Sequence, residues 1–215
     1  MKYKHVIWDW NGTVVDDVAL SVEVLNSILR LKDLPEISVE HYRENFGFPV
    51  SDFYEKLGFR LDPAESERLG NLFISRYNAR RFSCPMHDGV ESLMRRLNGG
   101  NVRQSILSAY RKDFLGEAAA HYGVDRFMTE IAGLDDIHAA TKTDLGRRLI
   151  SGLDAEPSQI LVIGDTDHDL EVARQNGADA ALVARGHQSH GRLAKTGAQT
   201  FKSFAELERR IFGNG

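Results

Sequence analysis

Two short segments carry acidic residues at spacings that suit chemistry on a phosphoryl group. The first reads Asp9-Trp-Asn11-Gly12-Thr13, and the second reads Gly164-Asp165 followed by Asp169. Carboxylates such as Asp9 and Asp165 repel each other when close, and Mg²⁺ is a hard cation that prefers oxygen ligands. With a cation between them both carboxylates stay ionised, and one oxygen of Asp9 is left free as a nucleophile. The two segments therefore indicate a magnesium site beside a candidate nucleophile.

Two further polar residues, Ser108 and Lys142, could complete this site. Ser108 ends an apolar run, and Lys142 comes just before a helix that we expect to begin near Thr143. A hydroxyl and an ammonium group can hold phosphoryl oxygens, whose charge must be neutralised in the transition state. Each residue alone also has a plainer interpretation, as a helix cap, a turn or a solvated side chain. Their order and their convergence favour the site.

The elements that must position these residues alternate between short apolar runs and amphipathic helices. We expect strands at residues 5–9, 102–108, 127–132, 159–164 and 180–184. Helical spacing lies between them, as in Val90, Leu93, Met94 and Leu97. Strands separated by single helices predict an α/β fold with a doubly wound, mainly parallel sheet. Such sheets bind ligands beyond the carboxyl ends of their strands, and the candidate site residues fall there.

Residues 17–84 interrupt this alternation, because they contain helix patterns and no convincing strand. A first helix is indicated by apolar residues that share one helical face, Val18, Val22, Leu25 and Leu29. Two shorter helices are expected at 39–46 and 50–57, and Asp62-Pro-Ala-Glu65 is typical of the start of a fourth. We predict a core of 1–16 and 85–215 with a small helical domain, 17–84, inserted after the first strand. The intervening Phe46-Gly47-Phe48-Pro49 either contacts the core or only links two helices.

Taken in order, the four segments resemble the four motifs of the haloacid dehalogenase-like (HAD) hydrolase superfamily, over residues 6–185. The helical insertion is similar to the cap of its phosphoglycolate phosphatase-like branch. The resemblance implies a HAD-type Rossmannoid core and an aspartyl-phosphate formed on Asp9. It also implies the roles of the remaining residues: magnesium binding by Asp9, the Asn11 carbonyl and Asp165, support from Asp169, phosphate binding by Ser108 and Lys142, and a substrate-site loop secured by Thr13.

One position departs from the family pattern. Phosphatases of this superfamily usually carry an aspartate where this chain has Asn11, and that acid protonates the leaving oxygen and then activates water. An amide can do neither, and losing general acid–base help typically costs a factor of about 10²–10⁴. Three hypotheses follow: a slow phosphatase or one for good leaving groups, deamidation of Asn11 before Gly12, or a proton from His168 or a cap residue. We favour the first.

Composition narrows the classes of function. The chain has 215 residues and a net charge of −4, which argues against a nucleic-acid partner. Its single cysteine, Cys84, excludes an intrachain disulfide and disfavours a thiolate zinc site. His187-x-x-His190 is more typical of a surface loop than of half a metal site. With no long apolar run and no signal peptide, we expect a cytoplasmic protein, monomeric or weakly dimeric, that does not bind membranes.

The leading hypothesis is a Mg²⁺-dependent phosphatase acting on a small phosphorylated metabolite. The alternative is a regulatory module that binds a phosphorylated metabolite and Mg²⁺ with little turnover. A phosphonate hydrolase is disfavoured because Lys32 and Lys56 are the only lysines available for a Schiff base in the cap. Halide removal is disfavoured because the chain keeps Gly164-Asp165, which the metal needs.

We predict that Asn11→Asp increases the rate of phosphate release, because the new carboxylic acid protonates the leaving oxygen. The gain is bounded by the factor of about 10²–10⁴ that general acid–base catalysis supplies. An assay of released phosphate with Mg²⁺ measures it, and Asp9→Asn serves as the inactive control. An unchanged or lower rate would show that another residue already transfers the proton.

Overall fold

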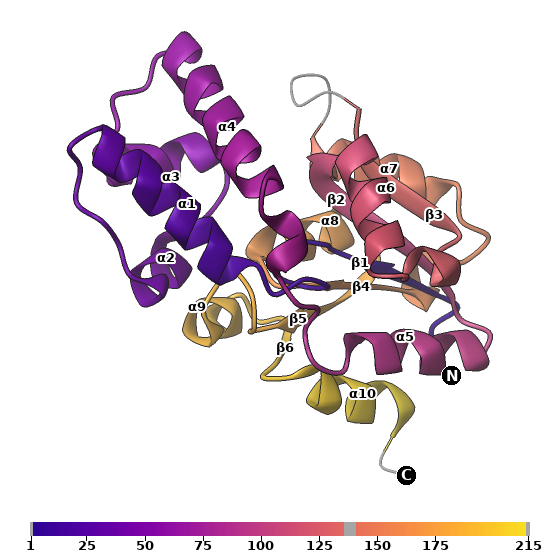
Figure 1. Ribbon diagram of the computed structural model, residues 1–215. Helices are drawn as coiled ribbons and strands as arrows, with labels where there is room; N and C mark the ends of the chain where they lie inside the picture. The colour runs from indigo at the N-terminus through magenta and orange to yellow at the C-terminus, as the bar shows by residue number, and fades with distance from the viewer. Residues whose placement is uncertain (1, 136–140, 214–215) are drawn as a thin grey trace.

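The computed structural model describes residues 2–135 and 141–213, and its centre is a six-stranded parallel sheet (Figure 1). The strands lie in the order β3-β2-β1-β4-β5-β6. Their bounds are β1 His5–Trp8, β2 Arg103–Arg111, β3 Glu130–Leu134, β4 Ile160–Gly164, β5 Asp179–Val183 and β6 Gln199–Phe201. The predicted α/β fold with a doubly wound parallel sheet is confirmed.

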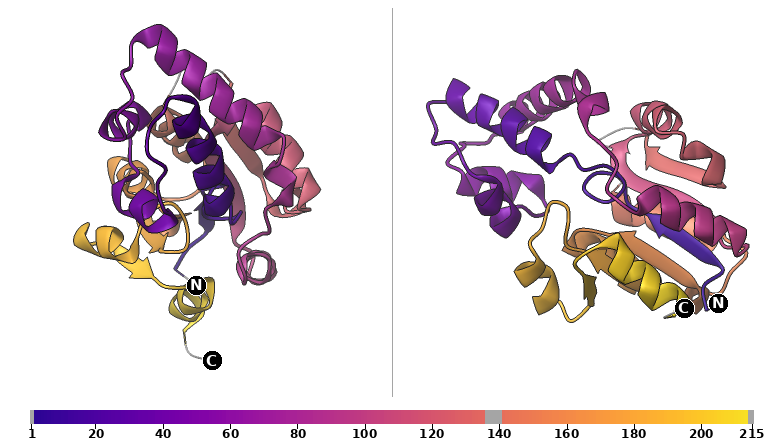
Figure 2. Two further views of the ribbon diagram at one scale, coloured as in Figure 1. Left: turned by 60° about the vertical axis from the view of Figure 1, so that its left-hand side comes forward. Right: turned by 60° about the horizontal axis from the view of Figure 1, so that its bottom comes forward.

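Helices cover both faces of this sheet, and α5 and α10 lie together on one of them (Figure 2). Side chains alternate between the faces of a strand, so Val6 and Trp8 of β1 pack with α5, α6 and α10, while Ile7 packs with α7 and α8. The helices of the core are α5 Val90–Gly99, α6 Lys112–His121, α7 Lys142–Ser151, α8 Asp167–Gln175, α9 His190–Lys195 and α10 Phe204–Phe212.

The strand predictions were wrong in three details. β6 was not predicted, because it has only three residues and therefore shows almost no periodicity. β3 begins later than expected, because Asp125–Phe127 forms a 3₁₀ turn. β2 does not end at Ser108 but continues to Arg111, although its pairing with β3 becomes irregular after Leu107.

The inserted segment consists of the four predicted helices, which lie together beyond one end of the sheet (Figure 1). Asp62 starts the longest of them as expected, because its carboxylate accepts a hydrogen bond from the backbone N–H of Glu65 at 2.8 Å. We call α1–α4 the helical unit; the domain boundaries at 17 and 84 stay a prediction. Its helices are α1 Val18–Leu31, α2 Val39–Asn45, α3 Val50–Lys56 and α4 Pro63–Asn78.

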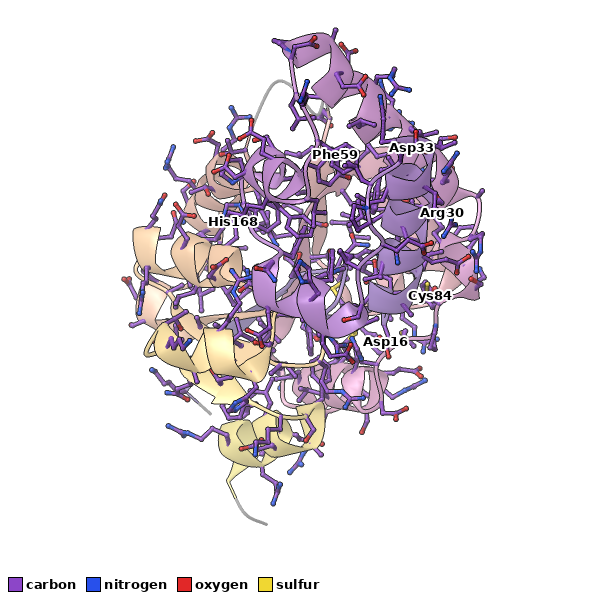
Figure 3. The ribbon with its side chains drawn as sticks, turned by 90° about the vertical axis from the view of Figure 1, so that its left-hand side faces the viewer. Asp16, Arg30, Asp33, Phe59, Cys84 and His168 are labelled. Carbon is purple, nitrogen blue, oxygen red and sulfur yellow. The ribbon has the colours of Figure 1, made fainter. Side chains whose placement is uncertain are left out.

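Paired chain segments and one linker join the helical unit to the core. The N–H of Asp16 donates to the carbonyl of Pro85 at 2.9 Å, next to the buried Cys84 (both Asp16 and Cys84 are labelled in Figure 3). The linker between α2 and α3 also meets the core, because Gln188 donates to the Phe46 carbonyl at 3.3 Å. The centroid of the Phe48 ring lies 4.8 Å from the centroid of the His168 ring. The prediction that this linker contacts the core is confirmed.

Across residues 2–135 and 141–213, the search for a helix with both the length and the apolar character needed to cross a bilayer found none.

The sheet imposes a steric limit at Gly133 of β3. A Cβ added there would lie 2.7 Å from Lys112 Cα and 2.8 Å from the Tyr110 carbonyl, so the backbone has to move. We predict that Gly133→Ala lowers the free energy of unfolding by about 1–3 kcal/mol. Gly116 in α6 has no atom within 4 Å of a new Cβ, so Gly116→Ala should instead raise it by about 0.5–1 kcal/mol. Urea unfolding measures both, and equal midpoints for the two variants would contradict the packing argument.

Candidate active site

A cavity of about 590 Å³ lies beyond the carboxyl ends of the strands, and it contains four of the predicted site residues. Asp9 and Asn11 enter it from the segment after β1, Ser108 from the irregular part of β2, and Lys142 from the first position of α7. Trp10 points the other way and packs against Tyr122 with ring centroids 5.9 Å apart. Parallel strands bring these distant residues to one edge of the sheet.

Three buried carboxylates meet beside this cavity, at the point where Asp9 lines it. Ligand oxygens of Asp9, Asp165 and Asp169 all lie within 4.8 Å of one another. Asp165 follows β4 directly, and Asp169 lies one helical turn further on, in α8. The four-residue spacing of Asp165 and Asp169 therefore brings both carboxylates to one site with Asp9, as the sequence predicts.

Lys142 compensates part of this negative charge. Its ammonium group donates to Asp9 Oδ1 at 2.5 Å and to Asp169 Oδ1 at 2.6 Å. Burial would lower the pKa of Lys142, but the two carboxylates raise it above its ordinary value. Burial would likewise raise the pKa of Asp169, yet Lys142 and the Thr166 hydroxyl hold it below its ordinary value. Lys142 and Asp169 are therefore a stable ion pair.

The negative charges of Asp9 and Asp165 are only partly compensated by these neighbours. Burial raises the pKa of Asp9 well above its ordinary value, with a further rise from Asp169 that Lys142 opposes. Burial, together with Asp169, also raises the pKa of Asp165. Three ionised carboxylates and one ammonium group carry a charge of −3 + 1 = −2. An all-oxygen cluster with that excess fits a hard divalent cation, which would keep both groups ionised.

Thr13 orients one of these carboxylates. Its hydroxyl is buried and donates to Asp165 Oδ1 at 2.8 Å, while the N–H of His187 donates to Asp165 Oδ2 at 2.5 Å. Gly12 permits this close approach, because a Cβ there would lie 2.4 Å from Asp165 Oδ2 and its φ is +73°. Thr13 is thus placed to secure the loop, and its direct contact with substrate stays a prediction.

A second buried group, around Asp17, escaped the sequence analysis. The Asp17 carboxylate accepts hydrogen bonds from Asn11 Nδ2 at 2.7 Å, from the Tyr77 hydroxyl at 2.7 Å and from the Gly12 N–H at 2.8 Å. His187 Nε2 lies 3.3 Å from the same carboxylate. Burial would lower the pKa of His187, but Asp17 raises it to about 9. Asp17 and His187 are therefore an ion pair beside Asn11.

No local signal marks these residues. Asp17 resembles the start of a helix, and Tyr77 lies on an ordinary apolar helix face. The expectation that His187 lies in a surface loop was wrong: it is buried, with Nδ1 3.0 Å from the Tyr42 hydroxyl, while His190 is exposed. Its partners come from the helical unit, so their proximity depends on tertiary packing.

The structure restricts the hypotheses for Asn11. Its amide nitrogen donates to both Asp17 and the Tyr77 hydroxyl, so the amide is held and offers no acidic proton. The N–H of Gly12, the group that would attack in deamidation, is itself bonded to Asp17 and to the Val15 carbonyl, which opposes that reaction. His168 contacts Glu171 at 3.0 Å and is not among the described residues that line the cavity.

Comparison with known proteins agrees with this geometry. The sequence model for haloacid dehalogenase-like hydrolases matches residues 6–183. The chain belongs to this family. It is 26% identical over 199 residues to a 5'-nucleotidase of Pseudomonas aeruginosa, covering 90% of this chain and 88% of that one. It is 22% identical over 205 residues to the tyrosine-protein kinase PtkA of Mycobacterium tuberculosis, covering 94% and 69%.

Solved structures place the same fold over the whole chain. A predicted phosphatase from Clostridium acetobutylicum superposes with a TM-score of 0.85 at 22% identity, covering 99% of both chains. The predicted membership of the haloacid dehalogenase-like superfamily is thus confirmed. The prediction that the protein is a hydrolase of this family is confirmed as well.

The ion pair of His187 with Asp17 predicts a pH-dependent stability. The folded pKa of about 9 lies above the unfolded value of about 6.5, so the stabilisation is complete below about pH 6.5 and is lost as pH rises through 9. We expect the free energy of unfolding to fall by about 3 kcal/mol across that range. Unfolding with a chelator present measures it, and His187→Gln should remove this contribution and leave a shallower slope. Equal slopes for both proteins would contradict the assignment.

Proposed function

We propose that the protein is a Mg²⁺-dependent phosphatase that hydrolyses the phosphate ester of a small metabolite, with Asp9 as the nucleophile. The observation that carries this proposal is the buried cluster of Asp9, Asp165, Asp169 and Lys142, from which Asp9 and Lys142 reach the cavity. Membership of a hydrolase family supports it. The cluster combines a nucleophile, a cation site and an ammonium group for phosphoryl oxygens.

The reaction would have two steps. Asp9 Oδ1 accepts a hydrogen bond from Lys142, which leaves Oδ2 to attack phosphorus. As that bond forms, the ester P–O bond breaks, and the leaving oxygen takes the electron pair. Water then attacks the phosphorus of the aspartyl-phosphate, which releases inorganic phosphate and restores the carboxylate. The Lys142 ammonium and the Ser108 hydroxyl would neutralise the phosphoryl oxygens during both steps.

Asp9, Asp165 and the backbone carbonyl of Asn11 are the residues that would hold Mg²⁺. When bound, the ion would supply positive charge for the phosphoryl group and keep both carboxylates ionised. Asp169 would support the site indirectly, because Oδ2 accepts from the Thr166 hydroxyl at 2.8 Å and Oδ1 from Lys142 at 2.6 Å.

The helical unit would act as a cap over this site. Phe46, Phe48, Val50, Phe73 and Ile74 all belong to 17–84, and they line the cavity opposite Asp9. Phe48 and Val50 are exposed, at 44% and 37% of their surface, and a bound substrate would cover them. Covering the site would exclude water and strengthen the electrostatic interactions within it.

Asn11 keeps a second candidate function open. Both hydrogens of its amide are engaged with Asp17 and Tyr77, so it transfers no proton in either step. A regulatory module that binds Mg²⁺ and a phosphorylated metabolite with little turnover has the same site. We favour the phosphatase, because the nucleophile and its ammonium partner are both retained.

We predict that the purified protein releases phosphate from phosphorylated metabolites, that Asp9→Asn abolishes the release, and that a chelator abolishes it until Mg²⁺ is restored. Loss of the nucleophile should lower the rate by a factor of about 10⁴ or more. Asp154→Asn changes an exposed aspartate in the same way and should retain full activity. Phosphate release at the level of Asp9→Asn would leave the regulatory module as the better description.

A further inference from the structure

A second cavity, of about 780 Å³, is lined mostly by the helical unit and adjoins the catalytic cavity. Asn11, Phe73, Ile74 and Tyr110 line both cavities, so a molecule with its phosphate at Asp9 can extend from one into the other. The volume is in the range of pockets that enclose a drug-sized ligand. We call this second cavity the cap cavity.

Aromatic side chains form the walls of the cap cavity. One wall is a single face of α4, where Gly70, Phe73, Ile74 and Tyr77 follow one another at helical spacing. The other rings that line the cavity come from α2, the residue directly after it, and α3: Tyr42, Phe46, Phe53 and Tyr54. Behind Tyr54, its ring stacks on that of Phe59 with centroids 5.2 Å apart (Figure 3 labels Phe59). Such walls suit an aromatic body, which can pack against rings edge-on or stacked.

The cap cavity offers no positive charge for a second anionic group. None of the described residues that line it is a lysine or an arginine, and its buried ionic residues, Asp17 and His187, pair with each other. In the catalytic cavity, Lys142 is held by two carboxylates, and Arg111 pairs with Asp113 at 2.6 Å. A carboxylate or a second phosphate on the substrate body would therefore be buried without a partner.

Among the described residues around Asn11, the polar groups already have their protons engaged. His187 lines both cavities, but its Nε2 lies 3.3 Å from the Asp17 carboxylate and its Nδ1 lies 3.0 Å from the Tyr42 hydroxyl. The Asn11 amide is engaged, and the Tyr77 hydroxyl donates to Asp17. Phenols have a pKa of about 10, so a phenolate leaves with far less need of a proton than an alkoxide. An aromatic cavity and a missing acid thus point to the same kind of leaving group.

We propose that the substrates are aryl phosphates, the phosphate esters of bulky uncharged phenols whose aromatic body fills the cap cavity. This inference rests on the proposed phosphatase function. An Asp9 oxygen bonds to phosphorus, the P–O bond to the phenol breaks, and the phenolate departs with the electron pair and takes a proton from solvent. Water then cleaves the aspartyl-phosphate to inorganic phosphate and the free carboxylate.

The first experiment tests the cap cavity. Biphenyl-4-yl phosphate and phenyl phosphate share a phenolic leaving group but differ in the size of the body. We expect kcat/KM to favour the biphenyl ester by about tenfold or more. A Cβ on Gly70 has no atom within 4 Å, so Gly70→Leu should project into the cavity and reduce this preference to about one, with Gly70→Ala intermediate. Gly116→Leu, at an equally open helical glycine outside the cavity, is the matched control and should preserve the preference.

The second experiment tests the leaving group and the charge. Wild-type protein should hydrolyse phenyl phosphate about 100-fold or more faster than benzyl phosphate, and Asn11→Asp should narrow that gap, because the acid helps the alkoxide most. Phosphoglycolate, with its anionic body, should be hydrolysed more slowly than phenyl phosphate. Faster hydrolysis of phosphoglycolate, no preference for the biphenyl ester, or identical effects of Gly70→Leu and Gly116→Leu would each overturn the inference.

A binding measurement separates this inference from the proposed function. If no ester is hydrolysed, the phosphatase proposal fails, and calorimetric titration of wild-type protein with biphenyl-4-yl phosphate and Mg²⁺ still reports on the cap cavity. Tighter binding than phenyl phosphate, weakened by Gly70→Leu, would support an aromatic ligand. Equal affinity for the two esters would overturn the proposal that the cap cavity binds an aromatic ligand.

Discussion

Three carboxylates buried around one ammonium group impose the constraint on which the site depends. Charges out of water are costly unless they are paired, so Asp9, Asp165 and Asp169 need Lys142, hydrogen-bond donors and a cation nearby. The parallel sheet meets this need, because it brings β1, β4 and the first turns of α7 and α8 to one edge. The position of Lys142 at the start of α7 is therefore as much a structural requirement as a chemical one.

A second charge pair connects the core with the helical unit. Asp17 directly precedes α1, Tyr77 lies in the last turn of α4, and His187 lies in the loop after β5. These three residues nevertheless meet beside Asn11. Because each donor occupies an acceptor position on one buried carboxylate, the network also fixes the orientation of the Asn11 amide. An aspartate at position 11 would face the Asp17 carboxylate, and this like-charged neighbour would raise its pKa toward the range of a useful general acid. The Asp17 carboxylate therefore suits an amide at this position, because it accepts a hydrogen bond from the Asn11 nitrogen at 2.7 Å.

In the proposed phosphatase, reactivity and selectivity would come from different parts of the chain. The charged residues stand at the ends of strands in the core, whereas the helical unit contributes apolar and aromatic surface. Both cavities meet at Asn11, where the bond to the leaving group would break. No described residue beside Asn11 has an acidic proton free for the leaving oxygen, and the cap cavity is lined by aromatic rings. In the proposed reaction, both features would limit which alcohols can depart.

Much of this arrangement could be predicted from local patterns. Alternating strands and helices determine a parallel sheet, the carboxyl ends of its strands share one edge, and Asp9, Asn11, Ser108, Lys142 and Asp165 consequently converge. Capping residues and helical spacing likewise predicted α1–α4 within 17–84. The three residues of β6 were too few to show a period.

The network around Asp17 and the cap cavity belong to the tertiary structure alone. His187 and Asp17 meet only after the helical unit packs on the core, so neither has a partner that spacing could reveal. The apolar face of α4 has the same pattern whether it meets a packed core or an open cavity. Periodicity reports which side of a helix is apolar, and only the packing of its neighbours determines whether that side is filled.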